Sequence, residues 1–334
     1  PEQVSQAKAM LDKKLVNVDI HQTDHILYSE AVLFADNDRV KVAIQDQHTN
    51  IILIEKNGEV IFEKEHDECA DCAPCDIFKQ VSAREIFEFS CEVELDKISF
   101  IGQAATLNRA LSNEGLRENY GLHIGRTLRK QVGSGLMSDD LLSKIMIETT
   151  AASDARMGGA TLPAMSNSGS GNQGIAATMP VVVVADYLNV NEEKRLRALF
   201  LSHLMAIYIH SKLPKLSALC AVTTASMGSC AGIAYLLTGK FETVSMGICS
   251  MIGDISGIIC DGASNSCAMK VSTSVASGYK SVIMAMDETH VTGNEGIVEH
   301  DLDRTIDNLC SIASKSMHHI DRQVIEIMVS KPCP

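Results

Sequence analysis

A polar loop with three glycines interrupts a strongly apolar part of the chain. The loop is Ser166–Gly174 (SNSGSGNQG), and it lies between Arg156–Ala160 (RMGGA) and the apolar run Ile175–Val184. Glycines let the backbone approach a ligand closely, and the N–H groups that open the following segment can bind an anion. A solvated linker is the plain alternative, but linkers seldom interrupt an apolar region. The loop is therefore predicted to bind an anionic group such as a carboxylate.

Three cysteines in the second half of the chain are candidate metal ligands. Cys220 ends the segment LSALC, and Cys260 and Cys267 bracket a glycine-bearing loop. Thiolates from a loop and from a helix end can meet at one metal centre, and sulfur ligands in an apolar shell suit an iron–sulfur cluster. The alternative for any single cysteine is inert packing in the core. We assign that role to the cysteines within apolar helical runs, Cys230, Cys249 and Cys310.

A second group of cysteines has the spacing C-x-x-C-x-x-C and consists of Cys69, Cys72 and Cys75. Locally it resembles the bacterial ferredoxin pattern, which would hold a cluster or zinc. It lacks a fourth ligand at the ferredoxin spacing and lies in an acidic connecting segment. Redox-labile thiols without a metal are the alternative for this run.

The segment Ser170–Gly174 is also similar to the carboxylate-holding loop of one class of pyridoxal-phosphate lyases. Such enzymes need a Schiff-base lysine and a glycine-rich phosphate cup within alternating β/α units. Lys270 is the only lysine near the polar motifs of the helical part, and the rhythm of a parallel sheet is absent from the sequence. The likeness indicates a shared task, which is to bind the carboxylate of an amino acid.

The first 95 residues are predicted to form a small antiparallel sheet with flanking helices. Helical spacing predicts a helix over Gln3–Leu15, and Val16–Ile20 is interpreted as a short strand. Asn57-Gly58 is typical of a two-residue hairpin turn. The predicted sheet strands are β-branched runs with partial alternation: Ile26–Ala35, Val40–Asp46, Thr49–Glu55 and Val60–Glu65.

The rest of the chain is predicted to be helical. Ser82 and Glu85 form a capping box that opens a helix through about Leu95. The further helices are predicted over Phe100–Ser112, Glu114–Val132, Ser138–Met157, Asn191–Lys212, Leu216–Leu237, Asp301–Lys315 and Asp321–Ser330. The expected fold class is α+β, with a small antiparallel-sheet subdomain over residues 1–95 and a large all-helical catalytic domain over residues 96–334.

Composition favours a globular protein that acts on a small molecule. The chain has 334 residues, 46% of them hydrophobic, and its many small and few aromatic residues predict closely packed helices. A net charge of -13 argues against nucleic acid or an anionic membrane as a partner. Charged residues and prolines break the apolar stretches, so no membrane span is expected. Eleven cysteines without a disulfide framework indicate a reducing, cytoplasmic location.

Taken together, the motifs resemble the iron–sulfur L-cysteine desulfidase family, which is related to the α part of bacterial iron–sulfur L-serine dehydratases. The segments that carry the resemblance are Arg156–Ala160, Ser166–Gly174, Leu216–Cys220, Ile259–Ala263 and Cys267–Lys270. The likeness extends to three further segments, His48–Ile51, Ile54–Gly58 and Asn119–Leu122. It therefore covers most of the chain.

The resemblance implies a [4Fe–4S] cluster held by Cys220, Cys260 and Cys267, with one iron left without a protein ligand. An amino acid would bind there with the bond to its leaving group polarised, while a base removes the α-proton. Sulfide would leave L-cysteine, and the remaining enamine would hydrolyse to pyruvate and ammonia. The expected substrate contacts are Ser166, Asn167, Ser168, Ser170, Asn172, Gln173, Arg156 and Lys270. Arg156 and Lys270 could instead belong to structural ion pairs.

The sequence departs from the family's pattern in one respect. Family members carry a Gly-Cys-Thr-Glu-Pro motif near the N-terminus, whose cysteine is thought to act on the α-proton, and this motif does not occur in the sequence. The catalytic base is therefore expected upstream of Pro1. If that segment is missing, this chain is expected to bind a cluster without efficient turnover.

Three functions stay open at this point. A carbon–sulfur lyase that acts on L-cysteine is the leading hypothesis, and L-serine dehydration by the same elimination is the close alternative. A cluster-bearing sensor or amino-acid-binding protein without turnover is the non-enzymatic alternative. The expected ligand is a small amino acid in each case, and self-association into a homo-oligomer is left open.

Overall fold

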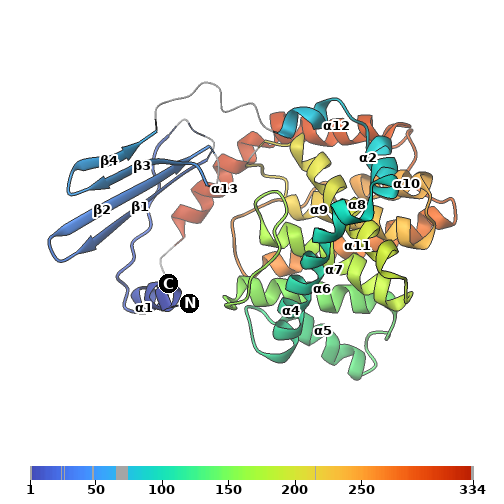
Figure 1. Ribbon diagram of the computed structural model, residues 1–334, viewed down its shortest axis with the longest axis horizontal. Coiled ribbons are helices and arrows are strands. Elements are labelled where there is room, and N and C mark those ends of the chain that lie inside the picture. Colours follow the sequence, from blue (N-terminus) through green and yellow to red (C-terminus); the bar gives the residue numbers. More distant parts are fainter. Residues whose placement is uncertain are drawn as a thin grey trace. The chain divides into compact units, whose positions relative to one another are not determined.

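The computed structural model describes residues 2–23, 25, 27–46, 49–64, 74–214 and 216–331. The chain forms two compact units, Pro1–Asp71 and Cys72–Pro334 (Figure 1). The first contains a four-stranded sheet and the second contains helices, which confirms the predicted α+β class. The division falls earlier than the predicted boundary after residue 95. The reason is that the helix Ala83–Glu92 buries its apolar face in the helical core.

The first unit is an antiparallel sheet preceded by one helix. Its elements are α1 (Glu2–Asp12), β1 (Tyr28–Ala35), β2 (Asp38–Gln45), β3 (Ile51–Lys56) and β4 (Glu59–Glu63). Each strand pairs with the next one along the chain, so the order in the sheet is β1-β2-β3-β4. All of its pairings are therefore hairpins, which are the sheet contacts that local sequence signals predict best.

The turn between β3 and β4 confirms the predicted hairpin. Asn57 and Gly58 have φ angles of 54° and 88°, as a type I′ turn requires. The Asn57 side chain fixes the turn against the neighbouring strand. Its Oδ1 accepts a hydrogen bond from the Arg39 N–H (2.7 Å), and its Nδ2 donates to Asp38 Oδ1 (2.8 Å).

The strand predicted at Val16–Ile20 is wrong. Residues 15–23 have no regular secondary structure, and Val18 is 88% exposed. A short β-branched run becomes a strand only where another strand pairs with it and buries alternate side chains. These residues are exposed along their length and lie outside the sheet order given above.

The second unit consists of helices joined by short connections. The helices are α2 (Ala83–Glu92), α3 (Leu95–Ile98), α4 (Gly102–Arg117), α5 (Ile124–Gly133), α6 (Leu141–Met157), α7 (Gly171–Tyr187), α8 (Glu192–Ser211), α9 (Ala221–Leu237), α10 (Phe241–Ile255), α11 (Cys267–Met286), α12 (Leu302–Ser311) and α13 (His318–Ser330). Shorter segments are the 3-10 turns η1 (Pro74–Lys79) and η2 (Ser99–Ile101) and the π-helical η3 (Ile312–Ser316). Over the described ranges, the model contains no helix of a length and apolarity that would cross a membrane.

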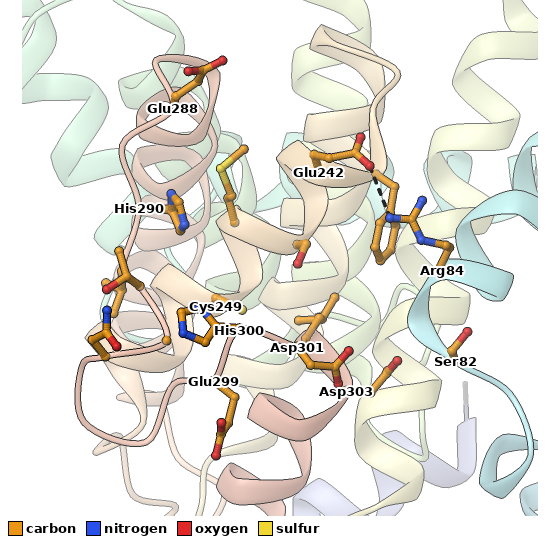
Figure 2. Close-up of a pocket in the computed structure, with 18 residues that line it drawn as sticks. Ser82, Arg84, Glu242, Cys249, Glu288, His290, Glu299, His300, Asp301 and Asp303 are labelled. Atoms are coloured by element: carbon orange, nitrogen blue, oxygen red, sulfur yellow. Dashed lines mark hydrogen bonds and ion pairs between the residues drawn. The ribbon is translucent and has the colours of Figure 1, made fainter.

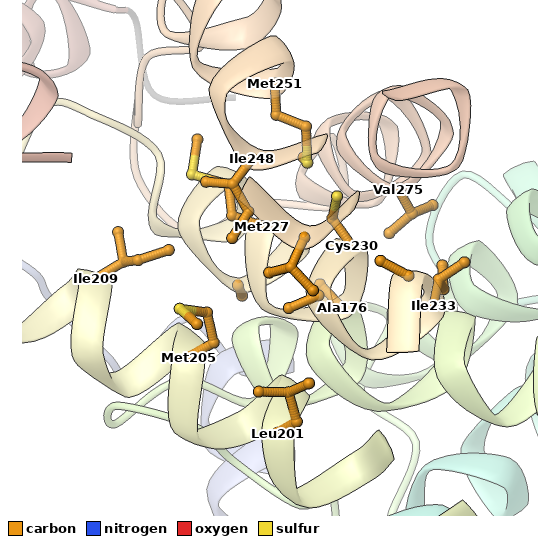
Figure 3. Packing of buried hydrophobic residues seen from close by; sticks show 14 of the residues in the cluster. Ala176, Leu201, Met205, Ile209, Met227, Cys230, Ile233, Ile248, Met251 and Val275 are labelled. Carbon is orange, nitrogen blue, oxygen red and sulfur yellow. The ribbon is translucent and has the colours of Figure 1, made fainter. Parts of the chain in front are cut away.

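Helix α9 lies at the centre of this unit and packs against α7, α8, α10 and α11 (Figure 1). Small residues bring these helices close together. A Cβ atom built on Gly228 of α9 would lie only 2.3 Å from the Ser202 carbonyl oxygen of α8. Figure 3 shows the side chains of Met205, Met227 and Cys230 converging in the same core, where each is fully buried. The close helix packing predicted from composition is confirmed.

The start of α2 confirms the predicted capping box. The Ser82 hydroxyl accepts a hydrogen bond from the Glu85 N–H (3.2 Å), and the Glu85 carboxylate accepts one from the Ser82 N–H (2.7 Å). The Asp303 carboxylate of α12 also accepts from the Ala83 N–H (3.0 Å). These bonds satisfy N–H groups that the first turn of a helix leaves without partners.

Two predicted helices have different bounds, and both differences help to form the candidate site. The predicted helix Glu114–Val132 is interrupted between α4 and α5, where Gly121 and His123 adopt positive φ angles of 52° and 44°. The predicted helix Leu216–Leu237 begins only at Ala221. The residues before it are extended instead, because Leu219 forms an isolated β-bridge with Ile259.

Candidate functional site

The β-bridge brings Cys220 and Cys260 onto adjacent extended segments. The Cys220 N–H donates to the Ile258 carbonyl oxygen (2.9 Å), and the Cys260 N–H donates to that of Ala218 (2.6 Å). Cys220 immediately precedes α9, whereas Cys260 lies in the loop between α10 and α11. Two cysteines that are far apart in sequence are therefore held together by backbone hydrogen bonds.

Cys267 joins this pair from the first position of α11. Its thiol donates to the Gly262 carbonyl oxygen (3.6 Å) and accepts from the Ser264 N–H (3.5 Å), so the loop folds back over it. Burial raises the pKa of Cys220 to about 11, and the nearby charges of Cys260 and Cys267 act in the same direction. The three cysteines are thus held on neighbouring segments by the backbone bridge and by the folded loop. We call Cys220, Cys260 and Cys267 the thiol corner.

The thiols of Cys220, Cys260 and Cys267 are of the ligand type that iron–sulfur clusters use. Among the residues that the model describes, no group of three His, Cys, Asp or Glu side chains is close enough to hold one metal ion. Cluster cysteines each bind a different iron and therefore stand further apart. Cys220 directly precedes α9, and Cys267 is the first residue of α11.

The polar loop forms a tight turn directly before α7. Asn167 and Ser170 exchange two backbone hydrogen bonds of 3.1 and 3.0 Å, and Ser168 and Gly169 between them have φ angles of 48° and 84°. The helix then starts at Gly171, so its first N–H groups follow the turn. Backbone N–H groups at the start of a helix can bind an anion.

The polar side chains of the loop divide into those that hold the turn and those that are available to a ligand. The Asn167 amide donates to His203 Nδ1 and to the His203 carbonyl oxygen, both at 3.1 Å, and accepts from the Ser168 hydroxyl (2.9 Å). Asn172 accepts from the Ser153 hydroxyl (3.1 Å). These contacts give Asn167, Ser168 and Asn172 structural partners.

Ser170 and Gln173 differ from those three residues. Within the described part of the chain, neither side chain makes a hydrogen bond, although Gln173 is only 5% exposed. Ser166, at the start of the loop, is exposed to solvent. The residues best placed to contact a ligand in this loop are therefore Ser170 and Gln173.

Arg156 lies over the N-terminus of α7. A Cβ atom built on Gly171 would lie 2.2 Å from Arg156 Nε, so only glycine leaves room for the guanidinium at this position. Burial lowers the pKa of Arg156, and the charge of Cys267 opposes that change. The Arg156 guanidinium therefore lies against the first residue of α7. Its one hydrogen bond to described residues joins Nη1 to the Met157 sulfur (3.0 Å).

Arg156 adds a positive charge at the start of α7. A guanidinium stays protonated in proteins, and a helix N-terminus carries a partial positive charge. A buried charge is more favourable when an opposite charge pairs with it. Across the described residues, no carboxylate forms an ion pair with Arg156.

The loop between α4 and α5 closes the site from another side. A Cβ atom on Gly158, just after α6, would lie 2.5 Å from the Gly121 backbone nitrogen. Gly121 in turn lies against Asn265, with 3.0 Å from a built Cβ atom to Asn265 Oδ1. Gly121 therefore packs against the end of α6 and against the loop that carries Cys260 and Cys267. The break in the predicted helix Glu114–Val132 is what makes this contact.

The ammonium group of Lys270 is bound by protein groups. Its Nζ forms an ion pair with the Asp261 carboxylate and donates to the Ile259 carbonyl oxygen (2.9 Å). Burial would lower the pKa of Lys270, but Asp261 and the nearby thiols of Cys220 and Cys267 raise it above its usual value. The sequence analysis allowed that Arg156 or Lys270 belongs to a structural ion pair. The structure contains such a pair for Lys270, with Asp261.

The other predicted metal ligands cannot be placed. Cys69, Cys72 and the side chain of Cys75 lie outside the described part of the chain, as does His48. Cys230 is fully buried in α9 against Gly247, and Cys310 is buried in α12, as expected of packing residues.

Two buried titratable residues behind the loop were missed by the sequence analysis. His203 of α8 bonds Asn167 and Thr178, with 2.9 Å from its Nε2 to the Thr178 hydroxyl. Asp154 of α6 accepts from the Gly125 N–H (2.8 Å) at the start of α5. Each residue holds a partner far from it in sequence, so no local pattern pointed to it.

Replacing His203 with glutamine should change how stability depends on pH. Burial lowers the pKa of His203 from 6.5 to about 4, so the folded state resists its protonation. The stability that neutral His203 contributes is therefore fully present above pH 6.5 and is lost as the pH falls through 4. A pKa shift of this size corresponds to about 3 kcal/mol. His203→Gln should be less stable than wild type at pH 7, and the difference should shrink by about that amount at pH 4.

Urea unfolding of both proteins at pH 7, 5.5 and 4 measures this difference. Asp154 acts in the opposite direction, because burial raises its pKa to about 6 and its contribution to stability is lost as the pH rises through that value. Its contribution is the same in both proteins and cancels in the comparison. A difference in stability that stays constant with pH would contradict the assigned state of His203.

A large hollow of about 1000 Å³ lies elsewhere in the helical unit (Figure 2). None of its described lining residues belongs to the thiol corner or the polar loop. Two of its acidic residues help to hold neighbouring elements: Asp303 accepts from the Tyr208 hydroxyl (2.5 Å), and Asp301 accepts from the Arg304 N–H (2.9 Å) at the start of α12. Glu242 pairs with Arg84 across 3.2 Å. The hollow is therefore a separate place in the helical unit from the thiol corner and the polar loop.

The chain belongs to the family described as the serine dehydratase alpha chain, whose family model matches residues 17–326. This match supports the relation to L-serine dehydratases and, with it, a general link to iron–sulfur amino-acid lyases. The narrower likeness to cysteine desulfidases is not part of that description.

The similar curated proteins are bacterial and are called UPF0597 proteins. One from Actinobacillus pleuropneumoniae serotype 3 (strain JL03) is 70% identical over 339 residues, which cover 99% of this chain and 76% of the relative. One from Dichelobacter nodosus (strain VCS1703A) is 61% identical over 331 residues, with the same two coverages of 99% and 76%. UPF0597 protein YhaM of Escherichia coli O1:K1 / APEC is 56% identical, over 98% of this chain and 76% of that protein. These names do not state an activity.

Proposed function

We propose that this protein is a [4Fe–4S]-dependent lyase that eliminates hydrogen sulfide from L-cysteine. The products would be sulfide, pyruvate and ammonia, with one water consumed when the enamine hydrolyses. The observation that carries this proposal is the position of the Arg156 guanidinium against Gly171, at the N-terminus of α7, together with the backbone bridge that joins the Cys220 and Cys260 segments. It joins a place for a cluster to a place for a carboxylate.

The residues of the chain have separate roles in this proposal. Cys220, Cys260 and Cys267 would hold the cluster, which supplies a Lewis acid that polarises the bond to the leaving group. Arg156 and the first N–H groups of α7 would bind the substrate carboxylate, because both present positive charge to the same place. Fixing the carboxylate sets the direction in which the α-proton and the β-substituent point.

Ser170 and Gln173 would complete the contacts with the substrate. Both side chains lie at the start of α7 and have no hydrogen-bond partner among the described residues. Asn167 and Asn172 would act indirectly, because His203 and Ser153 already bind their side chains and thereby hold the turn in shape. Lys270 is not assigned to the substrate, because Asp261 and Ile259 are its partners.

L-serine dehydration is a second candidate function, and the match to the serine dehydratase alpha chain family favours it. The same elimination would release water instead of sulfide and would use the same carboxylate site. The two substrates differ by one atom, oxygen or sulfur, at the β-position. The preference between them depends on the surroundings of that atom.

The test is an anaerobic assay of the complete natural protein after cluster reconstitution. Pyruvate is measured with L-cysteine and with L-serine, and sulfide is measured with L-cysteine. We expect pyruvate and sulfide in equal amounts from L-cysteine, with a lower kcat/KM for L-serine. A higher kcat/KM for L-serine would replace the first function with the second. Absence of pyruvate from both amino acids, with the cluster intact, would refute both.

A further inference from the structure

Lys270 contacts the chain on both sides of Cys260. It lies in the first turn of α11, three residues after Cys267, and its side chain is 19% exposed. Its ammonium donates to the Ile259 carbonyl oxygen (2.9 Å) and pairs with the Asp261 carboxylate. These two residues are the immediate neighbours of Cys260, which is itself exposed. One side chain of α11 thus reaches the segment that presents this thiol.

The opposite side of the same segment is held by the chain before α9. Ile258 accepts from the Cys220 N–H, and the Cys260 N–H donates to Ala218. In an extended segment successive carbonyl groups point to opposite sides. The Ile258 carbonyl therefore faces the Cys220 segment, and the Ile259 carbonyl faces Lys270. The Cys260 segment is held from two directions, by the residues that precede α9 and by a side chain of α11.

We propose that Lys270 is a positioning residue that sets Cys260 against Cys220 and Cys267. This inference rests on the cluster site proposed above but not on the reaction or its substrate. Each cysteine of the thiol corner comes from a different segment, so their relative positions depend on the contacts between those segments. The β-bridge fixes Cys220 to Cys260, and Lys270 fixes Cys260 to the helix that begins with Cys267.

The expected effect of removing this contact is a loss of metal retention. Partners that orient metal ligands typically contribute 10- to 100-fold to metal affinity when they are mutated. Lys270→Met keeps most of the aliphatic length but removes the ammonium, so we expect iron release to a chelator to accelerate by at least about 10-fold. Lys270→Arg retains a charged donor and should restore most of the retention. Asp261→Asn should give a smaller increase in release than Lys270→Met.

Lys280→Met is the matched control. Lys280 lies on the same helix and also pairs with a carboxylate, that of Asp254 at 2.7 Å, but it is away from the thiols. All four variants are reconstituted anaerobically, and iron release is followed through the loss of visible absorption. Hydrogen exchange of peptides that cover residues 256–266 is measured on the iron-free proteins. We expect faster exchange there for Lys270→Met than for wild type or Lys280→Met.

The outcomes separate this inference from the cluster site itself. If the wild-type protein holds a cluster but Lys270→Met releases iron and exchanges amides no faster than Lys280→Met does, Lys270 has no positioning role. If the wild-type protein takes up no cluster, both the proposed cluster site and this inference are refuted. If Lys270→Arg fails to restore retention although it folds with the wild-type melting temperature, the charged contact is not the cause.

Discussion

Cys260→Ala is expected to abolish the brown chromophore of the anaerobically reconstituted protein. Cys260 would be one of three thiols that each hold a different iron, and two ligands do not retain such a cluster. Iron and acid-labile sulfide should fall from about four of each per chain to background. The change is measured by visible absorption in the sulfur-to-iron charge-transfer bands and by chemical determination of the iron content. Cys260 is exposed, so the substitution should leave the helical core intact.

Cys91→Ala is the matched control for this prediction. Cys91 is a partly buried cysteine on α2, outside the thiol corner. Its variant should bind the same amount of iron as wild type, whereas Cys220→Ala and Cys267→Ala should behave like Cys260→Ala. Full iron content in Cys260→Ala would show that the cluster ligands lie elsewhere.

Arg156→Met is expected to lower kcat/KM for the amino-acid substrate by about 100-fold without loss of the cluster. The guanidinium lies at the N-terminus of α7 and has no carboxylate partner among the described residues, so its charge is available to the substrate. Hydrogen bonds to charged groups contribute about 1.5–3 kcal/mol, which is roughly 10- to 150-fold in binding. Steady-state kinetics and the iron content are measured together. The loss should appear mainly in KM.

Two further variants sharpen this test. Gly171→Ala should act in the same direction, because its Cβ atom would lie 2.2 Å from Arg156 Nε and must displace the guanidinium. Arg84→Met removes an arginine that lines the separate hollow and pairs with Glu242, and it should leave the kinetics unchanged. Wild-type KM in Arg156→Met, or a raised KM in Arg84→Met alone, would move the carboxylate site away from α7.

The parts of the fold that local sequence signals specify were predicted well. The hairpin at Asn57-Gly58 and the capping box of Ser82 and Glu85 both depend on residues within four positions of each other, and both are present. The strand predicted at Val16–Ile20 is absent, because a β-branched run forms a strand only when another segment pairs with it. Local signals describe the turn or cap itself but not the distant partner.

The candidate site shows the same limit more clearly. The β-bridge of Leu219 with Ile259 joins segments that are forty residues apart, so the late start of α9 could not be read from its apolar run. Asn167 was expected to contact the substrate, but His203 binds its amide from another helix. The residue types of the loop predicted an anion site. Which of its side chains hold the turn and which have no protein partner depends on tertiary contacts.

The resemblance supplied what spacing alone did not. Cys220, Cys260 and Cys267 have no common spacing motif, and each one alone is typical of a packing residue. Their convergence follows from the β-bridge and from the loop that folds back over Cys267, which are visible only in three dimensions. Residue type alone does not distinguish Arg156 from the other expected substrate contacts, but its approach to Gly171 makes it the strongest candidate for the carboxylate.

The most direct measurement is the Mössbauer spectrum of the natural protein reconstituted with iron-57, recorded without and with L-cysteine. A cluster held by three thiols leaves one iron open, so the signal of a single iron site should change when the amino acid binds, while the others stay as they were. The same change should be weakened in Arg156→Met at equal L-cysteine concentration. A protein that takes up no cluster, or a spectrum that L-cysteine leaves unaltered at every site, would contradict the proposed centre.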